Sequence, residues 1–318
     1  MIDLCMLLAG LACLYFGSEW LLRGALAMSQ RYQLAPIATG MVLLGLGTSA
    51  PELAVSLDAA LSHHGDMAVG NIVGSNIVNF ALVLGLAAAA CRIPTMTQTA
   101  LRDMLSLGVL TALMLAFMHD QHLSRLEGSV LFLGVAYVLW AAVRRPASTE
   151  ADDDKIAGDA STTSVGPDGG TSQLRRQIGL LIAGIAVLVV GAELTVAGGI
   201  GLARTFNIEE ATIALTVTAI GTGLPEIAAT LAAMARRQTG LALGNVIGSN
   251  LVNIGLVLGV SALAMPLDAE GIGFGPMAAL AILTALVLGV MALCRYVQRR
   301  MGFALLSAFG AYQVALFG

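Results

Sequence analysis

The stretch GTSAPELAVSL, residues 47–57, is written a second time in this chain as GTGLPEIAATL, residues 221–231. Both copies belong to a longer repeat, because residues 39–85 recur 174 positions later without insertion or deletion. Each copy holds one acid directly after a proline, Glu52 and Glu226, within sequence that is otherwise apolar. An ionisable group in such a setting is costly and is typical of a functional site. The repeat therefore predicts two carboxylates in one duplicated site.

The composition indicates a polytopic membrane protein of the all-α class. Hydrophobic residues make up 57% of the 318 residues and charged residues only 11%, which exceeds what the core of a soluble domain requires. A transmembrane helix needs roughly 20 mostly apolar residues. Ten segments fit this requirement: Leu4 to Ala27, Leu34 to Leu61, Met67 to Ala90, Leu101 to Met118, Leu126 to Val143, Ile178 to Ala203, Ala211 to Met234, Leu241 to Met265, Met277 to Leu293 and Met301 to Phe317.

The ten segments form two groups of five, predicted as a first five-helix repeat over residues 1–143 and a second over residues 178–318. The offset of 174 maps the first span onto the sixth, so an odd number of crossings separates equivalent positions. The two repeats are therefore predicted to be inverted in the membrane, as in many secondary transporters. The long polar segment between them, residues 144–177, is predicted to be a disordered linker. Its acids are expected to be solvated, and a regulatory role for them stays open.

The distribution of basic residues predicts the orientation. If the amino terminus lies outside, 14 of the 16 Lys and Arg residues fall on the cytoplasmic side, and only Arg125 and Arg204 fall outside. Cytoplasmic loops retain basic residues. Both termini are therefore predicted outside, and the central linker in the cytoplasm.

Residues that would indicate an enzyme or a soft-metal site are missing from the motifs. The four cysteines show no paired spacing, which predicts neither a disulfide nor a thiolate site. The four histidines lie outside the repeated motifs, and the sequence contains no HExxH motif and no phosphate-binding loop. The chain is therefore expected to be no enzyme and to need no cofactor.

Proline predicts a break in the second and seventh spans. Pro51 and Pro225 each follow a Gly-Thr pair, and proline removes a helical hydrogen bond. Such a break leaves backbone carbonyls free at membrane depth, where they are tolerated only beside other protein or a cavity. Free carbonyls next to Glu52 and Glu226 form an oxygen-rich cation site.

Polar residues at helical spacing follow in the third and eighth spans. They are Asn71, Ser75 and Asn79 in the first copy, and Asn245, Ser249 and Asn253 in the second. Spacing of four residues places each set on one helix face, and packing between helices is an alternative role for them. Hydroxyl and amide oxygens suit hard cations such as sodium or calcium rather than zinc or copper.

Two further acids, Glu19 and Glu193, lie at equivalent positions of the repeat. Glu19 has Arg23 four residues later, which predicts an ion pair on one helix face near the cytoplasmic edge. Glu19 is therefore not expected to bind the transported ion.

Two ionised glutamates predict antiport. A charge near −2 is neutralised by one calcium ion or by two or more sodium ions, and the two occupancies exclude each other. Two inverted repeats supply one state open to each side. A proton/calcium antiporter that uses the same glutamates remains an alternative, and a passive cation channel is a second one.

These motifs resemble those of the calcium/cation antiporter superfamily, and most closely its prokaryotic sodium/calcium exchangers. GTSAPE and GNIVGSNIVN in the first half, with GTGLPE and GNVIGSNLVN in the second, are similar to the paired alpha-repeats of that family. The resemblance implies calcium and sodium as partners, the bacterial cytoplasmic membrane as location, and no nucleic acid or obligate protein partner. It also implies that the first and sixth spans slide as a pair against the rest.

The resemblance also implies a role for each motif residue. The principal calcium ligands are Glu52 and Glu226, Thr48 and Thr222 contribute mainly carbonyl oxygens, Ser49, Ser75 and Ser249 line sodium sites, and Asn79 and Asn253 complete the centre. Two positions depart from the family pattern. Gly223 replaces a common serine, which puts the usual number of sodium ions in doubt, and Asn253 replaces a common aspartate, which favours potassium independence.

Overall fold

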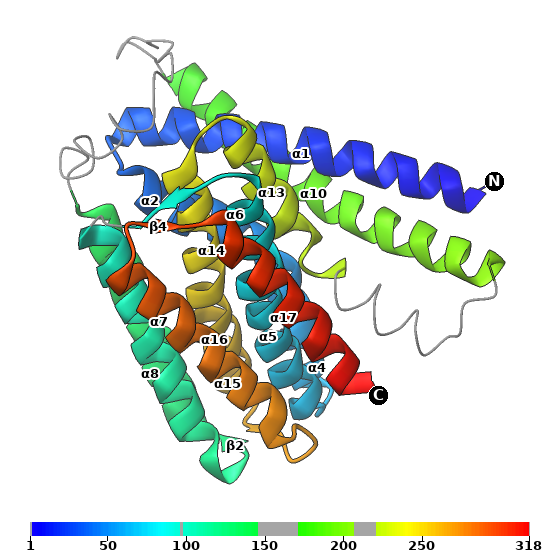
Figure 1. Cartoon of the computed structure of the whole chain (residues 1–318), viewed down its shortest axis with the longest axis vertical. Coiled ribbons are helices and arrows are strands. Elements are labelled where there is room, and N and C mark those ends of the chain that lie inside the picture. The colour runs from blue at the N-terminus through cyan, green and yellow to red at the C-terminus, as the bar shows by residue number, and fades with distance from the viewer. Residues whose placement is uncertain (1, 96–97, 146–170, 207–220, 318) are drawn as a thin grey trace.

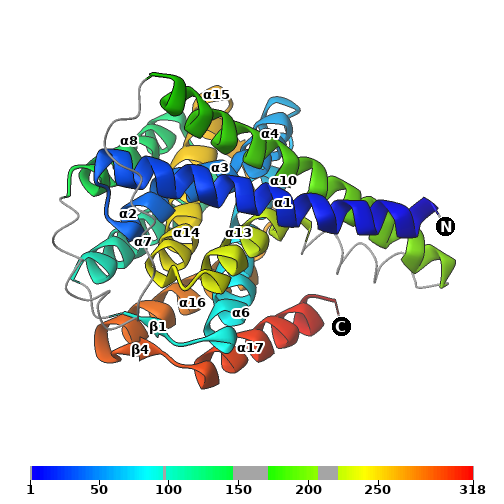
Figure 2. The same cartoon turned by 90° about the horizontal axis from the view of Figure 1, so that it is seen from above.

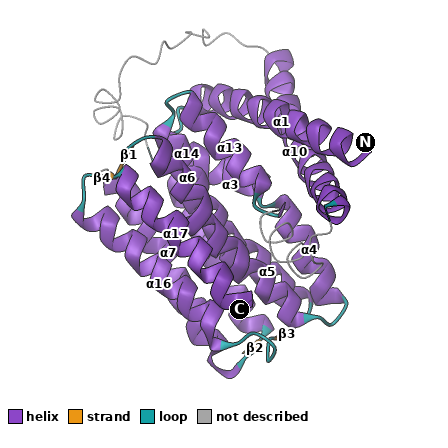
Figure 3. Ribbon diagram, turned by 45° about the vertical axis from the view of Figure 1, so that its right-hand side comes forward, coloured by secondary structure: helices purple, strands orange, loops and turns teal. Residues whose placement is uncertain are grey.

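The computed structural model describes residues 2–95, 98–145, 171–206 and 221–317, and most of these residues are helical (Figures 1 and 3). The first half contains α1 (Ile2–Tyr32), α2 (Pro36–Thr39), η1 (Gly40–Leu44), α3 (Gly45–Thr48), α4 (Ala50–Leu61), α5 (Gly65–Val78), η2 (Asn79–Val83), α6 (Leu84–Ala90), β1 (Ile93–Pro94), α7 (Gln98–Phe117), η3 (Met118–Asp120), β2 (His122–Leu123) and α8 (Arg125–Val143). The second contains α10 (Thr171–Thr205), α13 (Leu224–Ala235), α14 (Thr239–Val252), η6 (Asn253–Leu258), α15 (Gly259–Ala264), β3 (Leu267–Asp268), α16 (Phe274–Leu293), β4 (Tyr296–Val297) and α17 (Arg299–Phe317). The segments η1, η2 and η6 are π-helical, and η3 is a 3₁₀-helix.

The membrane class predicted from composition is supported by the helices themselves. Within the described residues, seven helices are long and apolar enough to cross a membrane, or eight if the bent pair Pro36–Thr48 and Ala50–Leu61 is one span. Large apolar side chains such as Leu133 and Ile182 are more than 60% exposed. A soluble protein rarely exposes such faces over whole helices, whereas lipid covers them in a membrane protein.

Two of the ten predicted spans differ from this set. For the seventh, residues 211–220 lie outside the described residues, and the described part holds α13, which at 12 residues is too short to cross alone. For the tenth, α17 is a helix of 19 residues in the predicted place, but it is not one of the seven described helices that are both long and apolar enough to cross a membrane.

The predicted linker is shorter than residues 144–177, because α10 begins at Thr171. Residues 171–177 contain Leu, Arg and Gln and no Pro or Gly, so they extend the apolar helix that follows at little cost. Residues 146–170 lie outside the described part of the chain.

Helices α1 and α10 run side by side across one face of the remaining bundle (Figures 1 and 2). Glycines spaced by seven residues line the contact: Gly10, Gly17 and Gly24 on α1, and Gly184, Gly191 and Gly198 on α10. A Cβ on Gly184 would lie 2.5 Å from the Leu21 backbone nitrogen and 2.9 Å from the Gly17 carbonyl oxygen. The two backbones therefore touch, which only residues without a side chain permit.

Two short ribbons lie at the two ends of α7. Antiparallel β1 and β4 pair Ile93 with Val297, whereas β2 and β3 pair Leu123 with Leu267. Subtracting 174 from the second-half position of each pair gives the same two positions, 93 and 123, so the ribbons are equivalent under the sequence repeat.

The turns after α4 and α13 are also equivalent under the sequence repeat. His63 and Arg237, 174 positions apart, have φ angles of 59° and 58° in the left-handed region. The His63 amide donates to the Ala60 carbonyl at 3.0 Å, and the Arg237 amide donates to the Met234 carbonyl at 2.9 Å. The two copies therefore share backbone geometry even where their side chains differ.

Helix α14 lies at the centre of the packing, where every residue from Leu241 to Val252 is buried. It packs closely against the broken second span: a Cβ on Gly45 would lie 2.8 Å from the Gly248 carbonyl carbon. This close approach brings the eighth predicted span directly beside the break in the second.

Candidate functional site

The predicted break in the second span is present. Helix α3 ends at Thr48, α4 begins at Ala50, and the two segments are bent by 48°. Ser49 precedes α4 with φ −82° and ψ 7°, and Gly223 precedes α13 with φ −83° and ψ −1°. Ser49 and Gly223 thus share one backbone conformation at the starts of α4 and α13.

Each copy of the motif places its glutamate in the first turn of a helix, α4 or α13. Glu52 and Glu226 follow Pro51 and Pro225, and proline is favoured there because its missing N–H would have no helical partner. The free N–H groups and dipole at a helix amino terminus favour a carboxylate. The local sequence therefore stabilises an anion at the start of each helix.

Both glutamate side chains are buried, Glu52 at 0% and Glu226 at 1% exposure. The two carboxyl groups lie close enough to interact electrostatically across the repeat. Their four carboxyl oxygens have no hydrogen-bond partner among the described residues. The same holds for the side-chain oxygens of Ser49, Ser75 and Asn253.

Such a group of buried, unpaired oxygens is uncommon, because an unsatisfied buried polar atom is destabilising. Among described residues, no ion pair joins either glutamate to a basic side chain, and no group of three His, Cys, Asp or Glu residues could hold a metal ion. Two carboxylates surrounded by hydroxyl, amide and carbonyl oxygens form a donor set suited to hard cations.

Asn71 and Asn245 hold the glutamate backbones in place. The Asn71 side-chain amide donates to the Ser56 hydroxyl at 2.9 Å and lies 3.5 Å from the Glu52 carbonyl oxygen. Asn245 repeats this geometry at 2.9 Å with Thr230 and at 3.5 Å with the Glu226 carbonyl oxygen. These asparagines therefore position the two glutamates, and their side-chain amides bind protein oxygens rather than an ion.

The two repeats are linked by side chains from α5, η2, α14 and η6. Asn79 donates to the Ser249 hydroxyl at 3.1 Å, and Asn253 donates to the Asn76 side-chain oxygen at 3.1 Å. The bonds are not equivalent, since Asn79 reaches a serine and Asn253 an asparagine.

Asn76 and Asn250 are buried residues that sequence analysis did not single out. Asn76 donates to the Asn250 carbonyl oxygen at 3.4 Å, across the repeat. Both belong to the pattern Gly-Ser-Asn of residues 74–76 and 248–250, and this repetition of an apolar-span asparagine is the signal that could have found them.

The predicted helix face bearing Asn71, Ser75 and Asn79 ends where the helix widens. Regular α-helix ends at Val78 and a π-helical segment begins at Asn79, and the second copy changes to π-helix at Asn253. A π-turn has a wider hydrogen-bond spacing and is frequent at functional sites. The Asn79 amide still donates to the Ser75 carbonyl four residues earlier, so the spacing of four residues holds as far as Asn79 and the widening begins after it.

Of the nine predicted site residues, eight are buried: Thr48, Ser49, Glu52, Ser75, Asn79, Glu226, Ser249 and Asn253. Thr222 is half-buried and lines a cavity together with Pro51, Glu193 and Pro225. The structure therefore brings the two motif copies together, with Thr222 at the edge of the group.

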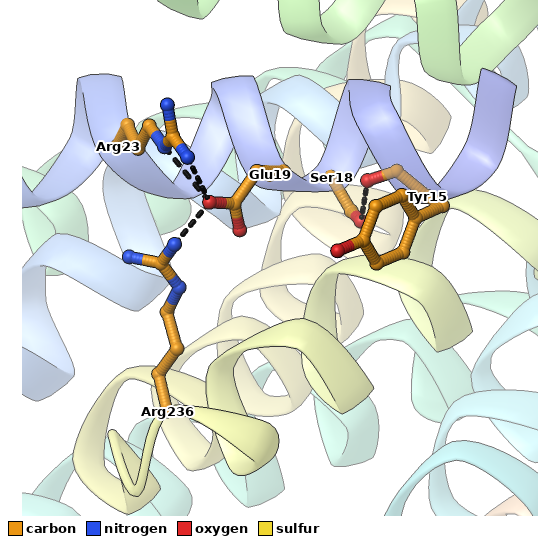
Figure 4. Close-up of polar contacts among 5 residues, drawn as sticks. All are labelled: Tyr15, Ser18, Glu19, Arg23 and Arg236. Atoms are coloured by element: carbon orange, nitrogen blue, oxygen red, sulfur yellow. Dashed lines mark hydrogen bonds and ion pairs between the residues drawn. The ribbon is translucent and has the colours of Figure 1, made fainter. Parts of the chain in front are cut away.

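The predicted pairing of Glu19 with Arg23 is confirmed, with 2.7 Å between the Glu19 Oε1 and an Arg23 guanidinium nitrogen. Figure 4 shows that Arg236, at the end of α13, points to the same carboxylate. This second ion pair joins residues 217 positions apart, and the sequence spacing did not predict it.

Comparison with known proteins agrees with this architecture. A family model described as sodium/calcium exchanger protein matches residues 2–144 and 176–318. The putative antiporter CaxA of Alkalimonas amylolytica is 35% identical over 320 residues, covering 98% of this chain and 97% of the relative. The inner membrane protein YrbG of Escherichia coli is 31% identical over 309 residues, covering 96% and 93%.

The fold is also similar to a solved structure. The sodium-calcium exchanger NCX_Mj, soaked with zero Na⁺ and Ca²⁺, superimposes with a TM-score of 0.82 at 30% identity, covering 99% of both chains. Other crystals of NCX_Mj were soaked with Na⁺ and Ca²⁺ or with Na⁺ and Sr²⁺. The chain is therefore an integral membrane protein that belongs to the sodium/calcium exchanger family.

Proposed function

We propose that this protein is a secondary active antiporter that exchanges sodium for calcium across the cytoplasmic membrane by alternating access. The observation that carries the proposal is the pair of buried carboxylates, Glu52 and Glu226, whose oxygens, like the side-chain oxygens of Ser49, Ser75 and Asn253, have no hydrogen-bond partner among the described residues. A hard cation would satisfy these oxygens and neutralise both charges. The family membership and the Escherichia coli relative named as an inner membrane protein support the reaction and the location.

Coupling follows from the charge of the site. A single calcium ion or two or more sodium ions neutralise two carboxylates, and both occupancies need the same oxygens. The empty site carries two buried negative charges, which makes its movement through a low-dielectric barrier costly. Exchange therefore requires that one kind of cation replaces the other.

The ligand roles implied by the family resemblance agree better with the observed hydrogen bonds for some residues than for others. The hydroxyls of Ser49 and Ser75 have no partner within the described residues and can turn toward sodium. Ser249 accepts from Asn79 and donates to the Asn245 carbonyl at 2.8 Å, so it must exchange one bond to become a ligand. Thr48 and Thr222 contribute carbonyl oxygens, and Asn79 and Asn253 complete the centre.

We propose ten crossings arranged as two inverted five-helix repeats, residues 1–143 and 178–318, with both termini outside and the linker cytoplasmic. The equivalent ribbons and the equivalent turns at His63 and Arg237 support the repeat. In this arrangement α13 is the inner half of the seventh span, and α17 is the tenth.

The function is tested in proteoliposomes that contain the purified protein. Uptake of labelled calcium driven by an outward sodium gradient at matched pH supports sodium/calcium exchange. Uptake that needs a pH gradient and ignores sodium would establish the proton/calcium alternative instead. Calcium flux without any counter-ion would indicate a passive channel.

A further inference from the structure

Glu19 and Glu193 are equivalent acids of the sequence repeat, but their surroundings differ. Glu19, on α1, is paired with Arg23 on its own helix and with Arg236 on α13 (Figure 4). The positions equivalent to these two arginines in the other repeat are Ala197 and Ser62. The sequence thus provides two basic partners for Glu19. The equivalent positions in the other repeat, which would pair with Glu193, hold uncharged residues.

Glu193 lies in the middle of an apolar helix. Helix α10 runs from Thr171 to Thr205 with a mean hydropathy of 2.4 in its most apolar window, yet the Glu193 side chain is exposed. The described residues provide no hydrogen bond or ion pair to its carboxylate. An ionised group is costly in hydrocarbon, so intramembrane acids normally face a water-filled cavity or another charge.

A cavity of about 200 Å³ lies beside Glu193. It is bounded by α10, by the start of α4 and by the start of α13, and its walls include Pro51, Thr222 and Pro225. The two prolines directly precede Glu52 and Glu226 in the chain. The cavity therefore lies between Glu193 and the residues that precede both site glutamates, and its other lining residues, among them Val55, Val189 and Val196, are apolar.

We propose that Glu193 is a cation-collecting carboxylate at a hydrated entrance to the exchange site, and that Glu19, neutralised by Arg23 and Arg236, provides no such charge at the opposite face. This inference rests on the proposed function and adds an access site for hydrated sodium and calcium. By the proposed orientation, the half of α10 that follows Glu193 leads outward, so the entrance serves the outer face. The two faces of the transporter then differ in how they concentrate cations.

The size of the effect follows from the charge of the ion. A unit negative charge about 8 Å away in water raises the local concentration of a divalent cation about fivefold and of a monovalent cation about twofold. Glu193→Gln should therefore raise the half-saturating calcium concentration about fivefold and that of sodium about twofold, at the outer face only. Added choline chloride at about 0.5 M should abolish both differences by screening.

The transport test uses right-side-out and inside-out vesicles with Glu193→Gln and with the matched variant Glu19→Gln. Glu19→Gln should leave outer-face half-saturation unchanged. A purely structural effect depends neither on the charge of the ion nor on the side of the membrane. The proposal would therefore be overturned if the half-saturating concentrations shifted equally at both faces, equally for calcium and sodium, or in a way that added salt does not reduce.

A second measurement does not depend on transport. Glu193→Cys, in protein whose four native cysteines are replaced by serine, should react with a membrane-impermeant cationic thiol reagent from the outside. Reaction only with a membrane-soluble maleimide would place the side chain in lipid and overturn the entrance, while sodium-driven uptake by the wild type would still support exchange. Outer labelling together with a wild type inactive in sodium-driven uptake would refute the proposed exchange and retain the hydrated entrance.

Discussion

Replacing either buried glutamate by glutamine tests the charge argument on which the site depends. Glu52 and Glu226 are 0% and 1% exposed, and glutamine has nearly the same volume, so the change removes charge without opening a cavity. Each carboxylate lies in the first turn of a helix, where an uncharged amide oxygen is also tolerated. Folding should therefore be retained.

The expected loss of calcium affinity can be worked from Coulomb's law. At an effective dielectric constant of ~20, a unit charge about 4 Å from a divalent ion contributes about 8 kcal/mol. The amide oxygen remains a ligand and a less charged site is less costly to bury, so we expect about half of this to appear as lost affinity. About 4 kcal/mol is a factor of roughly 1,000 in the dissociation constant.

The assay combines calorimetric titration of calcium into purified protein with sodium-driven uptake of labelled calcium. Glu270→Gln is the matched control, because it makes the same chemical change at an exposed acid in the turn after β3 and should alter neither measurement. Calcium affinity within tenfold of the wild type, with full uptake, in a folded Glu52→Gln or Glu226→Gln protein would refute the assignment of that carboxylate.

Three further predictions concern stability. Gly184→Ala should destabilise the folded protein by about 1–3 kcal/mol, because it forces a Cβ to within 3 Å of the α1 backbone. Gly179→Ala should not destabilise it, because a Cβ there meets open space. Equal melting temperatures of the two variants in detergent would contradict the close contact. Asp103 (0% exposed) and Arg145 (14%) form an ion pair at 2.7 Å, and a double-mutant cycle with Asp103→Asn and Arg145→Gln should give about 2 kcal/mol, less than a fully buried pair because Arg145 reaches solvent. The Asp268 carboxylate on β3 lies 2.6 Å from the His122 ring and raises the pKa of His122 above its usual 6.5. This ion pair therefore contributes its full stabilisation of the folded protein below about pH 6.5, and the contribution is lost as pH rises through the raised pKa. The difference in melting temperature between wild type and His122→Gln should shrink with rising pH, and a constant difference would exclude the ion pair as its source.

The sequence alone was sufficient for the class of protein and for the break and the buried glutamates of the repeated motif. Long apolar segments and a duplicated Pro-Glu motif are local features, and each has a direct structural consequence in a helix that crosses a membrane. The break after Thr48, the burial of Glu52 and Glu226 and the pairing of Glu19 with Arg23 were therefore predictable. Local features did not locate the start of α10, because helix propensity continued through a polar stretch.

The tertiary structure decided how the two copies meet. The contacts of Asn79 with Ser249 and of Glu19 with Arg236 join residues 170 and 217 positions apart, and no local pattern specifies which side chain faces which across two packed helices. The π-helical segments that begin at Asn79 and Asn253 were also not evident from regular spacing, because the spacing of four residues continues up to both asparagines. The sequence thus determined that each copy of one duplicated motif holds a carboxylate. The packing of glycine-lined helices determined that the two copies lie beside each other, because only close backbone contact brings α14 next to the break in the second span.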